Sequence, residues 1–147
     1  PITRETTEND KDSMPVEKYT GNGERILVVD DIEEQREIAA TILNRLNYSA
    51  TTVSSGEAAV DYLATGSVDL VVLDMIMDPG IDGYETYKRI LARHPGQKAV
   101  IASGFSETDR VKKAQHLGAG RYVKKPYTME KIGLAVKAEL AKIQPTA

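Results

Sequence analysis

Acidic side chains follow two apolar stretches of the sequence at the point where each stretch ends. The stretch Ile26–Val29 stops at Asp30 and Asp31, and the stretch at 69–73 stops at Asp74. Two adjacent carboxylates repel each other unless a positive charge lies between them. Oxygen ligands suit a hard cation such as Mg²⁺, which typically takes one or two carboxylates together with waters and phosphate oxygens. The sequence therefore predicts a magnesium site where two strands end.

A hydroxyl and an ammonium group end two further apolar stretches. Ser103 closes 98–103, and Lys125 stands before Pro126 at the end of 121–126. Taken singly, each has an ordinary structural explanation as a turn residue, a helix cap or a surface lysine. In an open α/β sheet, however, ligands bind beyond the carboxyl ends of the strands, where all these groups would meet. Their joint placement at the ends of four strands favours a functional site.

The elements that must position these groups alternate regularly along the chain. Short apolar or β-branched stretches predict strands at 25–30, 48–53, 69–74, 98–103 and 121–126. Segments with helical spacing, several of them opened by Ser or Thr caps such as Thr128, predict helices at 32–47, 54–66, 82–96, 106–120 and 128–143. Strands that are apolar throughout are buried on both faces, as parallel strands are. The fold class predicted is α/β, a doubly wound sheet of five parallel strands with five helices.

The amino-acid composition excludes some classes of function but does not identify the function. The chain has 147 residues and no Cys, which suits one domain plus a tail and excludes disulfide or thiol chemistry. No apolar run reaches the ~18 residues of a membrane span, and no signal peptide is present, so a cytoplasmic location without membrane contact is expected. The polar residues 1–24 predict a linker or the tail of an upstream domain, and 144–147 a short C-terminal tail.

Charge is distributed unevenly along the chain. Residues 25–105 carry a net charge of −5 and residues 106–147 a net charge of +5. The acidic half suits a cation site. The lysines of the basic half lie along predicted helices, so we interpret them as solvated helix faces and expect no nucleic-acid binding.

The strand-end residues resemble the signature of receiver domains of two-component response regulators. Asp30-Asp31, Asp74, Ser103 and Lys125-Pro126 match that signature in order, strand-end position and spacing, over about residues 25–143. The resemblance implies a flavodoxin-like strand order 2-1-3-4-5. It also implies a signalling domain, not an enzyme, that takes a phosphoryl group from a phosphohistidine with Mg²⁺ as cofactor.

The resemblance also implies a role for each matched residue. Asp74 would be the phosphoacceptor, ligating Mg²⁺ together with Asp31 and the main-chain carbonyl of Ile76, while Asp30 would act through water. Lys125, not Lys124, would contact the phosphoryl group. Residues with switching roles would be Ser103 and Tyr122. Residues that tune the lifetime of the phosphorylated form would be Ile76, Gly104 and Phe105.

A second resemblance links the chain to receivers at the C-terminus of hybrid sensor histidine kinases. The opening "PITRE" is similar to the tail of a kinase ATP-binding domain, and the stretch from Gly104 to the last helix is similar to such receivers. The partners implied are a histidine kinase, its own upstream kinase core or a histidine phosphotransfer protein. The sequence departs from the family pattern at one place, because "DMIMDPGIDG" carries Asp78 as an extra residue after the acceptor, which lengthens that loop.

Two other functions remain as alternatives. An Asp-nucleophile, Mg²⁺-dependent phosphatase of the haloacid-dehalogenase type would carry D-x-D where this chain reads "DMIMD". A structural receiver that takes no phosphoryl group would not need the intact acidic site. A nucleotide-binding module is disfavoured, because neither G-x-G-x-x-G nor a P-loop motif is present. The sequence leaves open the signal sensed, the cognate kinase and downstream partner, and whether a homodimer forms.

Overall fold

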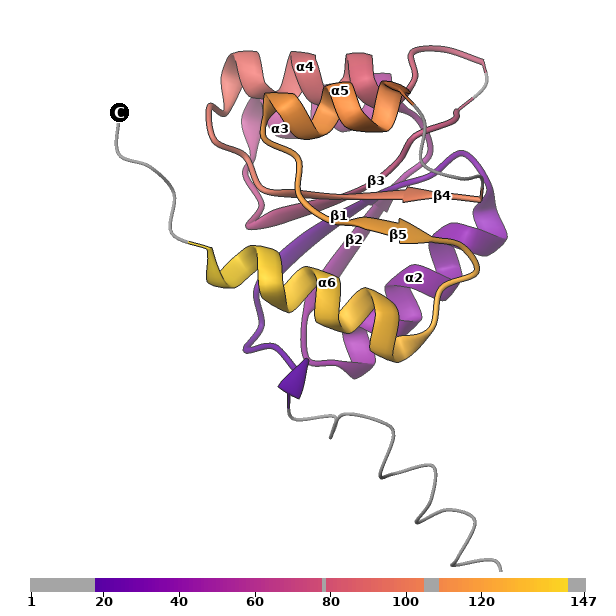
Figure 1. Ribbon diagram of the computed structural model, residues 1–147, viewed down its shortest axis with the longest axis vertical. Helices are drawn as coiled ribbons and strands as arrows, with labels where there is room; N and C mark the ends of the chain where they lie inside the picture. Colours follow the sequence, from indigo (N-terminus) through magenta and orange to yellow (C-terminus); the bar gives the residue numbers. More distant parts are fainter. Residues whose placement is uncertain (1–17, 78, 105–108, 143–147) are drawn as a thin grey trace, which may run out of the picture.

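The five strands form one parallel sheet in the computed structural model, which describes residues 18–77, 79–104 and 109–142 (Figure 1). The strands are β1 (Arg25–Val29), β2 (Ser49–Val53), β3 (Leu70–Asp74), β4 (Ala99–Ser103) and β5 (Tyr122–Lys124). Their order in the sheet is β2-β1-β3-β4-β5, and every neighbouring pair is parallel. The predicted fold class and strand order are confirmed.

Helices cover both faces of the sheet. They are α2 (Glu33–Arg45), α3 (Gly56–Thr65), α4 (Gly83–Arg93), α5 (Asp109–Leu117) and α6 (Met129–Ala141). Figure 1 shows α2 and α6 on one face and α3, α4 and α5 on the other. None of the helices in the described part of the chain is both long enough and apolar enough to span a bilayer.

The three inner strands, β1, β3 and β4, are buried on both faces, which explains why they read as continuous apolar runs, whereas the edge strands β2 and β5 are partly exposed. Along β1, Ile26 and Val28 pack toward α2 and α6, whereas Leu27 and Val29 pack toward the opposite helices. All four side chains are at most 1% exposed. Burying such a side chain contributes ~1.5–3 kcal/mol, so the central strands fix the sheet firmly and hold their C-terminal residues in register.

Short polar side chains start three of the helices. Ser55 Oγ accepts a hydrogen bond from Ala58 N (3.0 Å), Asp82 Oδ1 from Glu85 N (2.9 Å), and Thr128 Oγ1 from Lys131 N (3.2 Å). These bonds satisfy backbone donors that have no partner within the helix. Ser106, the first residue of the helix predicted at 106–120, lies outside the described residues.

The described part of the fold includes residues before the first strand, within the stretch that the sequence indicated as a linker. Tyr19 is only 8% exposed and belongs to the apolar core between the sheet, α2 and α6. Its ring fits against Gly133, where an added Cβ would lie 2.6 Å from Tyr19 Cδ2. Gly21 N donates to Leu46 O (2.7 Å), and Lys137 Nζ donates to Thr20 O (2.8 Å). The polar composition of residues 1–24 did not predict the burial of Tyr19, because the residues that surround its ring belong to helices far along the chain.

Replacing Tyr19 with alanine should lower the free energy of unfolding by roughly 3 kcal/mol, because a buried aromatic side chain is lost and a cavity remains. Urea denaturation followed by circular dichroism measures the change. Tyr19→Phe keeps the ring and should cost far less. A Tyr19→Ala variant as stable as the parent would show that the segment before β1 is not part of the fold.

Candidate functional site

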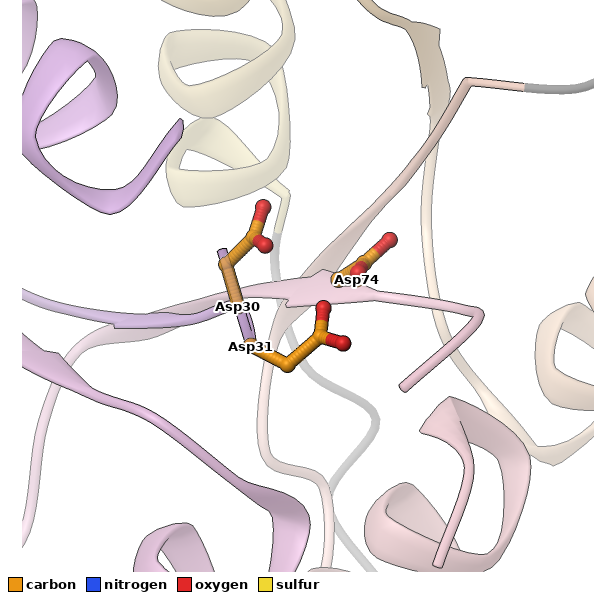
Figure 2. Close-up of side chains that lie close together, drawn as sticks. All are labelled: Asp30, Asp31 and Asp74. Atoms are coloured by element: carbon orange, nitrogen blue, oxygen red, sulfur yellow. The ribbon is translucent and has the colours of Figure 1, made fainter. Parts of the chain in front are cut away.

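Three carboxylates meet at the C-terminal edge of the sheet (Figure 2). Asp30 and Asp31 follow β1, and Asp74 ends the neighbouring strand β3, whose residues pair in register with those of β1. One oxygen from each lies within 4.8 Å of the others. Asp30 and Asp74 are buried, at 0% and 4% exposure, and Asp31 is half-buried. The sequence predicted this convergence, and the parallel pairing of β1 with β3 brings it about.

Lys125 places its ammonium group between two of these carboxylates. Nζ lies 2.5 Å from Asp30 Oδ2 and 3.4 Å from Asp74 Oδ1. The backbone fixes its position, because Lys125 N donates to Ser103 O (2.8 Å) across the β4–β5 pair. Lys124, one residue earlier, is exposed and forms part of a different surface. Of the two adjacent lysines, the structure therefore brings Lys125 to the acidic cluster.

Asp30 is held on several sides. Its Oδ1 accepts a hydrogen bond from Ile32 N (2.9 Å), and its carbonyl oxygen accepts one from Arg36 Nη1 (2.9 Å). With Oδ2 at Lys125, both carboxylate oxygens of Asp30 already have protein donors. Asp31 and Asp74 are therefore better placed than Asp30 to bind a cation directly.

Burial raises the pKa of Asp74 to about 7, from an ordinary value of 3.8. Removing a carboxylate from water disfavours its charged form, and this outweighs the opposing attraction of Lys125. The negative charges of Asp30 and Asp31 raise the pKa further. A cation bound beside Asp74 would counter the same cost, so the cluster has the electrostatics of a cation site.

The structure places the remaining predicted site residues differently, and only some of them line the site pocket. Ser103 ends β4 and is 2% exposed, and Tyr122 is half-buried on β5. Ile76 is 51% exposed, between the buried Met75 and Met77. Gly104 lines the site pocket, whereas Phe105 lies outside the described residues.

The pocket over the acidic cluster has a volume of about 480 Å³. It combines acidic, basic and apolar groups, and its lining residues are Asp31, Ile32, Gln35, Asp74, Ile76, Gly104, Lys125 and Pro126. A pocket of this size at the carboxyl ends of the strands is where a doubly wound sheet binds its ligands.

Two residues around the site were not singled out from the sequence. Arg36 supports the Asp30 backbone from the first turns of α2. Tyr127 is buried at 8% exposure, with its ring centre 5.9 Å from Lys125 Nζ. Burial raises the pKa of Tyr127 far above its ordinary value, and the nearby charges of Asp30 and Asp74 add to the effect. The only sequence signal for Tyr127 is its place just after Lys125-Pro126.

The chemistry of the donor set fits Mg²⁺. The three carboxylates offer hard oxygen ligands, and the side of the cluster facing the pocket leaves space for waters or phosphate oxygens. His and Cys take no part in this cluster, which disfavours zinc and other ions that prefer nitrogen or sulfur ligands.

Comparison with known proteins agrees with this geometry. The sequence model described as the response regulator receiver domain matches residues 26–137, which is most of the chain. The chain belongs to the response regulator receiver family. It is thus a phosphoacceptor signalling domain of two-component systems, and the acidic cluster lies where such a domain needs it.

Individual receivers show the same relationship. The chain is 32% identical over 117 residues to sporulation initiation phosphotransferase F of Bacillus subtilis, covering 80% of this chain and 94% of that protein. It is 31% identical over 115 residues to the sensory transduction protein RegX3 of Mycobacterium tuberculosis, covering 78% of this chain but 50% of that protein. The receiver thus spans about half the length of some of its curated relatives.

Solved structures place the fold in the same family. The response regulator protein TrrA from Thermotoga maritima, solved in complex with Mg²⁺-BeF, superposes with a TM-score of 0.71 at 32% identity. The match covers 78% of this chain and 97% of that one. A receiver domain protein from Methanospirillum hungatei, at 21% identity and a TM-score of 0.75, shares the fold.

The raised pKa of Asp74 makes the stability of the receiver depend on pH. Because the folded state holds the Asp74 proton more tightly than the unfolded state, stability is lost as pH rises from about 4 to about 7. Asp74→Asn removes that cost. Solvent screening limits the gain to roughly 1–3 kcal/mol at pH 8, with little gain at pH 4.5.

Urea denaturation of both proteins at the two pH values, in a metal-free buffer, measures this difference. Asp61→Asn on the exposed side of α3 removes one carboxylate elsewhere and serves as the control. An Asp74→Asn variant that gains the same stability at pH 4.5 as at pH 8 would contradict the assignment of the raised pKa.

Proposed function

We propose that Asp74 accepts a phosphoryl group from a phosphohistidine of a histidine kinase or histidine phosphotransfer protein. The observation that carries this proposal is the position of Lys125 Nζ, 3.4 Å from an Asp74 oxygen inside the acidic pocket. An Asp74 oxygen attacks phosphorus, the bond from phosphorus to the histidine nitrogen breaks, and that nitrogen keeps the electron pair. The product is an acyl phosphate on Asp74.

The residues around Asp74 hold charged groups in place and form no covalent bond with the phosphoryl group. Phosphoryl transfer spreads negative charge over the equatorial oxygens, so fixed positive groups lower the barrier. Lys125 contacts one of these oxygens, and moving there requires it to loosen its contact with Asp30. Asp31, Asp74 and the Ile76 carbonyl would hold Mg²⁺, with Asp30 contributing through water. Bound there, Mg²⁺ neutralises developing charge and orients the phosphoryl group.

Ser103 and Tyr122 would transmit the event to the surface. A phosphoryl oxygen on Asp74 offers a new acceptor to the Ser103 hydroxyl, which lies at the end of the adjacent strand β4. Movement of Ser103 would leave room for the half-buried ring of Tyr122 on β5. The local change in charge would then favour one of two arrangements of the surface formed by α5, β5 and α6.

The donor protein would approach over α2. Ile32 and Ile76, which both line the pocket, are 52% and 51% exposed, and Pro126 in the same lining is exposed as well. An apolar rim around a charged pocket suits a helix that brings its phosphohistidine to Asp74 while excluding water from the reacting atoms. We also propose that this receiver is part of a hybrid histidine kinase in the cytoplasm, with the residues before Tyr19 leading to its kinase core.

Incubation with Mg²⁺ and a small phosphodonor such as acetyl phosphate should add one phosphoryl group, measured by intact mass. The Asp74→Asn variant should gain no phosphoryl group. The Lys125→Met variant should be labelled far more slowly, because one phosphoryl oxygen would lose its contact with the Lys125 ammonium group. Equal labelling of the parent and Asp74→Asn would refute Asp74 as the acceptor.

Substitutions of the two adjacent acids, Asp30 and Asp31, should lower the affinity for Mg²⁺ by different amounts. Asp31→Asn should weaken binding by roughly tenfold or more, whereas Asp30→Asn should have the smaller effect, because its oxygens already have donors. Titration calorimetry measures both. Equal losses would show that Asp30 and Asp31 ligate the ion alike.

The phosphorylated form should hydrolyse slowly. Ile76 is apolar and exposed at the pocket, so it cannot orient an attacking water, and the same is expected of Phe105. Ile76→Asn and Phe105→Glu should change the hydrolysis rate of purified phosphoprotein, followed by mass spectrometry after the donor is removed. Unchanged rates in both variants would exclude these positions as determinants of lifetime.

A further inference from the structure

A groove between β5 and α6 lies apart from the phosphorylation pocket. Its volume is about 360 Å³, and its lining residues are Arg121, Tyr122, Val123, Lys124, Lys131, Leu134 and Ala135. β5 is an edge strand of the sheet, and Figure 1 shows α6 running beside it. Leu134 and Ala135 give the groove an apolar floor, and the ring of Tyr122 lines it as well.

The charged groups of this groove all have the same sign. Arg121, Lys124 and Lys131 are exposed. The cations that form ion pairs among the described residues are others, namely Arg89, Arg110, Lys125 and Lys142. Glu139 is buried and directs its carboxylate to Arg121 N (3.1 Å) and Lys142 Nζ (2.9 Å). The groove is therefore a basic surface with an apolar base, suited to an acidic segment that carries apolar side chains.

The chain itself contains such a segment, directly before the first described residues in the sequence. Residues 1–17 hold five acids and two bases, a net charge of −3, together with Met14 and Val16. They join the fold at Tyr19, whose ring lies against Gly133, while Thr20 O accepts from Lys137 Nζ. Both contacts are on α6, the helix that also supplies Lys131 and Leu134 to the groove. Seventeen extended residues reach up to ~56 Å, far more than the width of one helix.

We propose that the acidic segment of residues 1–17 binds across the β5–α6 groove of its own chain and covers Tyr122. Anchoring at Tyr19 makes the contact intramolecular, so weak ion pairs act at an effective concentration in the millimolar range. A second copy of the chain fits less well, because a two-fold contact through this groove would set cations against cations. A partner that recognises the Tyr122 surface would have to displace the segment first.

A paramagnetic label tests this contact directly. The chain has no Cys, so Asn9→Cys gives a single attachment site for a nitroxide without changing the net charge. In the full chain at low salt, amide signals of β5 and of the first half of α6 should lose most of their intensity relative to the reduced label. At ~1 M salt, where the Debye length falls to ~3 Å, they should recover.

A matched pair of charge variants locates the contact. Lys124→Gln with Lys131→Gln should abolish the signal loss in the groove, whereas Lys112→Gln with Lys113→Gln, exposed on α5 at the opposite face, should preserve it. Signal loss that is absent, that lies elsewhere, or that is insensitive to Lys124 and Lys131 would overturn the proposal. So would loss seen between labelled and isotope-enriched copies in a mixed sample, which would mean binding in trans. None of these measurements requires phosphorylation, so their outcome is independent of the proposed function.

Discussion

The repulsion among three carboxylates, and the single ammonium that relieves it, govern the arrangement of the rest of this site. Asp30, Asp31 and Asp74 hold oxygens within 4.8 Å of one another, and two of the three residues are buried. Lys125 offsets part of that cost through its contacts with Asp30 and Asp74. The pKa of Asp74 remains raised despite this contact, so further positive charge at the cluster would stabilise the ionised carboxylate. The electrostatics of the site therefore favour binding of a divalent cation together with a phosphoryl group.

The packing of the sheet compensates for the electrostatic repulsion within the acidic cluster. β1 lies between β2 and β3, and the chain leaves it toward α2 on one face, while α3 leads into β3 from the other face. This reversal opens a crevice at the carboxyl ends of β1 and β3, the position at which doubly wound sheets bind ligands. The apolar strands beneath are almost fully excluded from water. Their burial provides the free energy that holds the charged groups together.

Contacts with several elements constrain the described part of the loop after Asp74, where the receiver resemblance predicted an extra residue. Met75 and Met77 are buried in the core, which directs Ile76 outward. Glu57 Oε2 of α3 accepts from Ile81 N (3.1 Å), and Arg110 of α5 donates to Asp82 Oδ2 (2.6 Å). Gly83 N donates to Met75 O (3.0 Å), and an added Cβ at Gly83 would lie 2.6 Å from Asp74 O. The loop is therefore tied to the helices that flank it as well as to the acceptor strand.

The sequence alone determined the alternation of strands and helices and the polar residues at the strand ends. Both depend on local periodicity or on a residue's distance from a strand end, which a linear pattern records. The choice of Lys125 over Lys124 came from the resemblance of Lys125-Pro126 to the receiver signature. Tertiary structure alone decided that both oxygens of Asp30 have donors, that Arg36 and Tyr127 support the site, and that Tyr19 belongs to the core. These contacts join residues that lie far apart in the chain or depend on the direction of a side chain. Tyr19, for example, is buried because Gly133, more than a hundred residues later, lacks the side chain that would otherwise fill its place.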